Sequence, residues 1–265
     1  MSNPSASNNS QSLPSHDRIP LACDCRGQGE PLLLFVHGWT CRRAYWSPQL
    51  DYFGTTHAVA APDLPGHGES GCGDRNCWGV EPFARDIVAC VDALAPEKVV
   101  LIGHSMGGAV ALEAARRLKD KVAGVVLVDT FVIDYGGLNP ETVQTFAAPF
   151  ETDFPAAMAD LVAGTATAAT PPELRERLVS EMSAADPAWA LPVWRDLLSW
   201  SPTAAFKELR TPIHAINGEL IPASARERCA PFVTETVIAG AGHFLQMENP
   251  AQFNRVLETV LSQLR

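Results

Sequence analysis

The sequence contains no apolar run of the roughly 18 or more residues that a helix needs to span a lipid bilayer. Basic residues are also scarce: 20 lysines and arginines stand against 30 aspartates and glutamates, which gives a formal net charge of -10. Proteins bind a phosphate backbone largely by releasing counterions at a basic surface, and this composition provides none. We therefore expect neither a membrane nor a nucleic-acid partner.

The start of the chain lacks the features of a leader. Residues 1–18 are rich in serine and asparagine, and they have neither the positively charged start nor the apolar centre of a signal peptide. We expect this stretch to be a disordered tail and the protein to be cytoplasmic.

A disulfide framework is not expected either. The seven cysteines are an odd number in a chain that is large enough to fold without such links, so we expect mostly free thiols. Cys23 and Cys25 lie close in sequence, as do Cys72 and Cys77. No pattern of paired cysteines and histidines completes a tetrahedral zinc site around them, and we predict no metal site.

Hydrophobic residues make up 46% of the chain, and several form short uninterrupted apolar runs. Such runs are typical of strands that helices cover on both faces. Helical periodicity separates them at residues 81–94 and 106–118, and a last helix is expected from Pro250, with Asn249 as its N-cap. This alternation predicts an α/β fold with a doubly wound, mostly parallel sheet. The expected strands are residues 31–37, 98–102, 122–128, 212–216 and 234–238.

One stretch interrupts the alternation. Residues 132–206 contain several helix-start signals and many aromatic residues, which indicates an inserted helical cap on a core formed by residues 19–131 and 207–265. Most of these aromatic side chains are expected to attach the insertion to the core. A few of them could instead line an apolar pocket over a site.

The strongest local signal is the run Gly103-His104-Ser105-Met106-Gly107, which follows an expected strand and opens an expected helix. Small glycines permit a sharp turn there, with the Ser105 hydroxyl exposed above the carboxyl edge of the sheet. The start of the helix brings backbone N–H groups close to it. We predict that Ser105 is a nucleophile.

The sequence here resembles the α/β-hydrolase superfamily, over the whole chain except its first residues. The motifs that carry the resemblance are His37-Gly38-Trp39, residues 62–68 (PDLPGHG), the Ser105 turn and residues 240–244 (GAGHF). The resemblance implies that His243 is the base that activates Ser105. It also implies an oxyanion hole formed by the backbone N–H groups of Trp39 and Met106.

The acid of the triad departs from the family pattern. Where many members have a Gly-x-x-Asp run after the penultimate strand, this chain has Gly218-Glu219-Leu220-Ile221, and Ile221 cannot orient an imidazole. Two replacements are available. Asp129, at the end of an earlier strand, resembles the acid of some haloalkane dehalogenases and of cofactor-free dioxygenases; we prefer it, with Glu219 as the alternative acid.

These residues favour an enzyme of the carboxylesterase type. It would hydrolyse a small carboxylic ester or related acyl compound through an acyl-enzyme, with a Ser-His-Asp triad and no cofactor. Two alternatives stay open. A cofactor-free dioxygenase of an N-heteroaromatic compound would use only a His-Asp dyad, and a receptor-like homologue would bind its ligand without efficient turnover.

Overall fold

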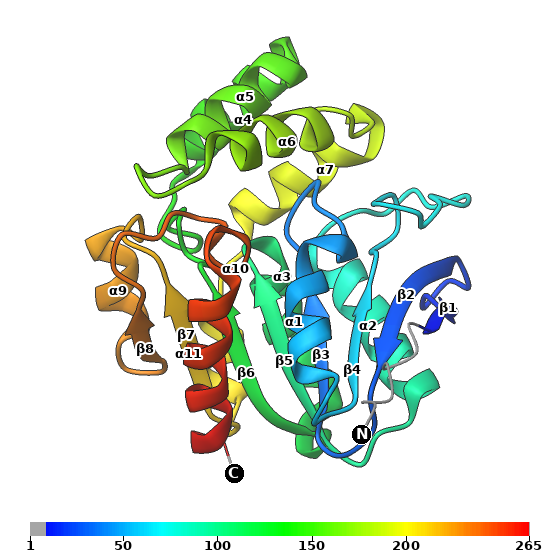
Figure 1. Ribbon diagram of the computed structural model, residues 1–265. Coiled ribbons are helices and arrows are strands. Elements are labelled where there is room, and N and C mark those ends of the chain that lie inside the picture. The colour runs from blue at the N-terminus through cyan, green and yellow to red at the C-terminus, as the bar shows by residue number, and fades with distance from the viewer. Residues whose placement is uncertain (1–8, 265) are drawn as a thin grey trace.

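A computed structural model, which describes residues 9–264, has one eight-stranded sheet at its centre (Figure 1). The strand order is β1-β2-β4-β3-β5-β6-β7-β8, and all neighbours are parallel except that β2 runs against both β1 and β4. The fold is therefore the predicted α/β arrangement around a mostly parallel sheet. The strands are β1 (Asn9–Pro14), β2 (Pro20–Arg26), β3 (Leu32–Val36), β4 (Val59–Pro62), β5 (Val99–His104), β6 (Val122–Val128), β7 (Ile213–Asn217) and β8 (Thr234–Val237).

Helices cover both faces of the sheet because successive side chains of a strand point to opposite sides. In β3, Leu33 and Phe35 pack into the apolar cluster formed with α1 (Ser47–Phe53) and α11 (Pro250–Gln263). Leu34 and Val36 pack into the cluster on the other face, under α2 (Val80–Leu94) and α3 (Met106–Leu118). Shorter helices are α9 (Ala223–Cys229), α10 (Leu245–Glu248) and two 3-10 turns at Arg43–Trp46 and Lys119–Lys121.

The expectation of a disordered tail over residues 1–18 is wrong for its described part. Asn9–Pro14 form β1, which pairs along its length with β2, from Asn9 opposite Cys25 to Pro14 opposite Pro20. The sequence of this strand is mostly polar and shows no apolar pattern; the ladder with β2 and the buried Leu13 hold it at the edge of the sheet. Residues 1–8 lie outside the described residues.

The segment between β6 and β7 forms five helices, here called the inserted helices: α4 (Pro140–Thr152), α5 (Phe154–Gly164), α6 (Pro172–Met182), α7 (Pro187–Ser199) and α8 (Thr203–Glu208). In Figure 1, α4 to α7 gather beyond one end of the sheet. Side-chain caps start three of them, because Asn139 accepts a hydrogen bond from the Thr142 amide, Asp153 from the Ala156 amide and Asp186 from the Ala188 amide. In the part of the chain that the structure describes, no helix combines the length and apolarity that crossing a bilayer requires.

Candidate active site

Ser105 stands at a strained turn between β5 and α3. Its backbone has φ 54° and ψ -124°, a region that a residue with a side chain rarely occupies and that costs about 1–3 kcal/mol. The turn is held by the Ser105 amide, which donates to the Val128 carbonyl of the neighbouring strand at 2.9 Å. A side chain at Gly103 would collide with the carbonyl of Gly107. The glycines thus permit the tight turn that the sequence predicted.

His243 lies in the loop after β8, and three contacts fix it. Its Nδ1 is 2.7 Å from Oδ2 of Asp129, its amide donates to the Thr165 carbonyl at 3.0 Å, and its carbonyl accepts from Nε2 of His104 at 2.9 Å. A carboxylate only accepts hydrogen bonds, so Nδ1 carries the proton and Nε2 keeps its lone pair. The contact with Asp129 thus sets which ring nitrogen of His243 is the acceptor.

Asp129 follows the last residue of β6 and is fully buried. Its other carboxylate oxygen, Oδ1, accepts a hydrogen bond of 2.7 Å from the Gly218 amide, which directly follows β7. Gly218 must be a glycine, because a side chain there would collide with the carbonyls of Ala241 and Gly242. Asp129 therefore reaches the imidazole from β6 and is anchored on the very loop where many family members carry the acid.

Glu219, the alternative acid, makes a different contact. Its Oε1 accepts a hydrogen bond of 2.7 Å from the Gly240 amide, and its side chain is exposed. The Glu219 carboxylate thus stabilises the loop that leads to His243, and its hydrogen bond is to the backbone and not to the imidazole. Ile221 is 7% exposed and packs in the core.

The two expected oxyanion donors lie on either side of Ser105. Met106 is the first residue of α3, where amides have no acceptor within the helix. The loop that carries Trp39 packs closely against Ser105, since a Cβ placed on Gly38 would lie 3.1 Å from the Cβ of Ser105. The Trp39 indole has its own role: its Nε1 donates to the Ala190 carbonyl at 3.0 Å, and it stacks on Trp194 with ring centroids 4.4 Å apart.

Ser105 and His243 line one cavity, together with Trp39, Trp194 and other mostly apolar residues. Its volume is about 30 Å³, which leaves room for about two water molecules. The inserted helices supply part of its wall, through Leu161, Val162 and Thr165 of the α5 region. Ser105 and His243 therefore lie in a cavity that these helices help to enclose.

Comparison with known proteins identifies the family of the chain. A profile described as "Alpha/beta hydrolase family" matches residues 33–256, which is most of the chain. The chain belongs to the alpha/beta hydrolase family. This hydrolase is 30% identical to the pimeloyl-(acyl-carrier protein) methyl ester esterase of Aromatoleum aromaticum over 87% of its own length and 98% of the relative's. It is 29% identical to the protein of the same name from Sodalis glossinidius, over 90% of its own length and 96% of the relative's.

A solved structure of a thermophilic esterase from Thermogutta terrifontis superposes on the hydrolase with a TM-score of 0.83 at 26% identity, covering 97% of this chain and 99% of that one. A bifunctional biotin biosynthesis protein of Cellvibrio japonicus is matched over only 18% of its length. The Aromatoleum and Sodalis relatives and the superposed structure are named esterases, and the hydrolase is accordingly an enzyme of the ester-cleaving type.

Three other histidines of the hydrolase hydrogen-bond the backbone. His37 Nδ1 donates to the Gly38 carbonyl at 2.8 Å while its Nε2 accepts from the Leu64 amide at 3.0 Å, so this ring is neutral. His67 Nδ1 lies 3.0 Å from the Pro65 carbonyl oxygen. Burial lowers the pKa of His37, His67 and His104, because desolvation disfavours the charged form.

These buried histidines predict a loss of stability in mild acid. Below a pH of about 6.5 the unfolded chain binds protons on them and the folded chain does not, so the free energy of unfolding falls as pH falls. Each contributes up to about 1.4 kcal/mol per pH unit until its lowered folded pKa is reached. Urea unfolding at pH 7.5 and 5.5 should therefore show a loss of several kcal/mol, and the slope should be smaller in His67→Gln. A stability that is unchanged or higher at pH 5.5 would contradict this explanation.

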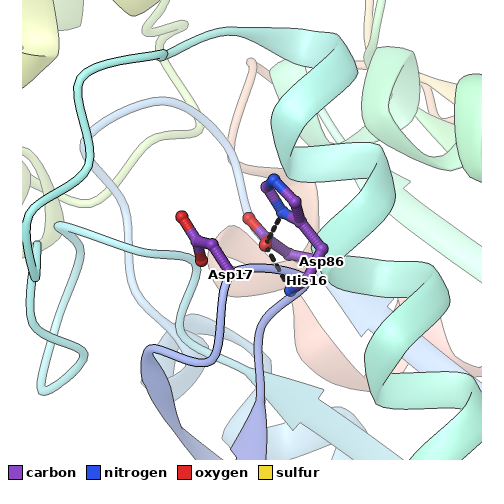
Figure 2. A group of neighbouring side chains, drawn as sticks. All are labelled: His16, Asp17 and Asp86. Atoms are coloured by element: carbon purple, nitrogen blue, oxygen red, sulfur yellow. Dashed lines mark hydrogen bonds and ion pairs between the residues drawn. The ribbon is translucent and has the colours of Figure 1, made fainter.

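One cluster of described residues has metal-ligand chemistry and lies away from the active site, where the turn after β1 meets α2. Figure 2 shows His16, Asp17 and the buried Asp86, with His16 Nδ1 2.6 Å from Oδ1 of Asp86. The Arg75 guanidinium binds both acids, at 2.7 Å to Asp17 Oδ1 and 2.7 Å to Asp86 Oδ2. Arg75 occupies oxygens of both carboxylates and offsets one of their two negative charges, so the group is an ion-pair network that ties the turn after β1 to α2.

The sequence did not reveal the two residues whose backbone groups hold His243 and Asp129 in place. Gly218 had a signal, a glycine two positions beyond the end of an expected strand, but its amide was not assigned to Asp129. Thr165 had none, because it comes from the inserted region and meets His243 only in the folded chain. All seven cysteines are described, and all are free thiols, as expected.

Proposed function

We propose that the hydrolase cleaves a small carboxylic ester through an acyl-enzyme on Ser105. The observation that carries the proposal is the 2.7 Å contact between His243 Nδ1 and Asp129 Oδ2, in a cavity that His243 shares with Ser105. This contact leaves Nε2 of His243 free to accept a proton. A serine hydroxyl needs such a base to act as a nucleophile near neutral pH.

The reaction has two halves. His243 Nε2 takes the proton of the Ser105 hydroxyl as Oγ attacks the ester carbonyl, and the amides of Trp39 and Met106 stabilise the resulting oxyanion. Collapse of this intermediate breaks the ester C–O bond, and the imidazolium returns the proton to the departing alcohol. Water, deprotonated by His243, then attacks the acyl-enzyme and releases the acid. Asp129 stabilises the imidazolium in both halves.

The substrate class follows from the cavity and from the relatives. Two of the relatives that match over most of their length are named for the methyl ester of a pimeloyl group on acyl-carrier protein. For this chain we infer a carboxylic ester with an apolar acyl or alcohol part, because the cavity wall is mostly apolar. We also propose that residues 132–206 act as a cap, and that the inserted helices move to admit a substrate that the present volume cannot hold.

Rapid-mixing kinetics with a chromogenic ester test the proposal. Where deacylation is slower than acylation, the alcohol should appear in a burst whose amplitude approaches one equivalent per active site, followed by steady turnover. The matched control is the same ester with His243→Ala, which should show no burst because Oγ keeps its proton. If wild-type protein turns over no ester of any tested chain length, the proposed function is wrong.

A further inference from the structure

A second, more open groove lies against the catalytic cavity. It has a volume of about 400 Å³ and is formed mainly by α4, α5 and the loop after β6. The cavity and the groove have five lining residues in common: Val132, Ile133, Leu161, Thr165 and Trp194. Since the same side chains face both spaces, an ester bound at Ser105 that is longer than the cavity would extend into the groove.

The groove is apolar with a single charge. Phe146, Phe150 and Leu220 are among its walls, and Asp160 is the one charged residue that lines it. The Asp160 side chain is exposed, and among the described residues it has no cationic partner, in contrast to Glu151, which pairs with Arg195.

The wider surroundings strengthen this negative charge. Residues 122–174, which include the whole of α4 and α5, contain no lysine and no arginine but seven aspartates and glutamates, of which Asp134 and Glu151 pair with arginines outside this range. A negatively charged group in the groove would therefore meet repulsion with no compensating base from these two helices. A positively charged group would find an unpaired carboxylate beside an apolar wall.

We propose that this groove binds the distal end of the ester and that Asp160 is a specificity-determining residue, which selects cationic or uncharged distal groups over anionic ones. The inference rests on the proposed ester hydrolysis at Ser105. It adds to the proposed substrate class the charge of the group at the distal end of the ester. An apolar chain with an ammonium or a neutral end matches the groove, because the walls bind the chain and the carboxylate attracts the cation. A chain that ends in a carboxylate does not match it.

Three esters of equal length, cleaved at the same methyl ester and ending in a methyl, a carboxylate or a trimethylammonium group, test the proposal. An exposed charge pair changes affinity by about threefold, upward for attraction and downward for repulsion. At low salt, kcat/KM should therefore be about tenfold higher for the cationic ester than for the anionic ester. The difference should lie mainly in KM, and 0.5 M salt should shrink it.

Variants identify the residue responsible. Asp160→Asn should bring the cationic-to-anionic ratio close to one, and Asp160→Lys should invert it, each ratio being measured within the same variant. Glu176→Gln is the matched control: it removes one exposed carboxylate from α6, away from the groove, and should leave the ratio unchanged.

The outcomes separate the two proposals. If the neutral ester is cleaved but the wild-type ratio is near one, or if Asp160→Asn keeps the wild-type ratio, the groove proposal is overturned and the hydrolase proposal stands. If none of the three esters is cleaved, the result contradicts the proposed ester hydrolysis at Ser105. An equal fall in the ratio for Glu176→Gln would show a diffuse field of the whole acidic chain and would also overturn the role of Asp160.

Discussion

Replacing Ser105 with alanine should lower kcat for ester hydrolysis by about 10⁵- to 10⁶-fold, to the residual rate that binding and the oxyanion donors alone provide. The reason is chemical: the variant keeps His243 and Asp129 in place but has no oxygen that can form the acyl-enzyme. Steady-state assays with a chromogenic ester measure the effect, and KM should change little, because the cavity wall is retained.

Ser180→Ala is a suitable control, since it removes an exposed serine hydroxyl from α6 and should leave kcat unchanged. The Ser105 variant also separates the two enzymatic interpretations of the site. A dioxygenase that uses only the His243–Asp129 pair would consume oxygen with a hydroxyquinolone, and it would keep doing so in Ser105→Ala. Such oxygen uptake, with unchanged low esterase activity, would contradict the acyl-enzyme proposal.

The second large effect is expected for Asp129→Asn, which should lower kcat by about 10⁴-fold. An asparagine can still accept the hydrogen bond from the Gly218 amide through its oxygen, so the loop should keep its position. Its NH₂ group would then face Nδ1 of His243 as a donor. The imidazole would carry its proton on Nε2 instead, where it can no longer accept the proton of Ser105.

The matched comparison is Glu219→Gln. Glutamine keeps a side-chain oxygen for the Gly240 amide, and the contact of this residue lies in the loop before His243 and not on the imidazole. We expect kcat within a few-fold of the wild-type value. A loss of about 10⁴-fold in Glu219→Gln, with Asp129→Asn close to wild type, would assign the acid to Glu219.

The central elements were predictable because their residues are uniform in character. The expected strand at residues 122–128 is found as β6 (Val122–Val128), and the helix expected at residues 106–118 is α3 (Met106–Leu118). Buried parallel strands and helices packed on them leave a strong apolar pattern in the sequence. The C-terminal helix began at Pro250 behind the Asn249 cap as predicted, because capping is a local interaction.

Other features depend on partners that are distant in sequence. β1 has no apolar pattern and exists through its ladder with β2. Asp129 and His243 are 114 residues apart, and the choice between Asp129 and Glu219 depended on how two loops meet at the end of the sheet. The groove at Asp160 was not predicted, since its walls come from α4, α5, α7 and a loop whose relative placement no local pattern encodes.

Mass spectrometry of the protein after treatment with a fluorophosphonate tests the central claim most directly, namely that His243 and Asp129 make Ser105 a nucleophile. The account predicts one covalent adduct per chain, located on Ser105, formed quickly in wild-type protein and lost or strongly slowed in folded His243→Ala. An unmodified Ser105 in folded wild-type protein, or labelling at the same rate in His243→Ala, would contradict it.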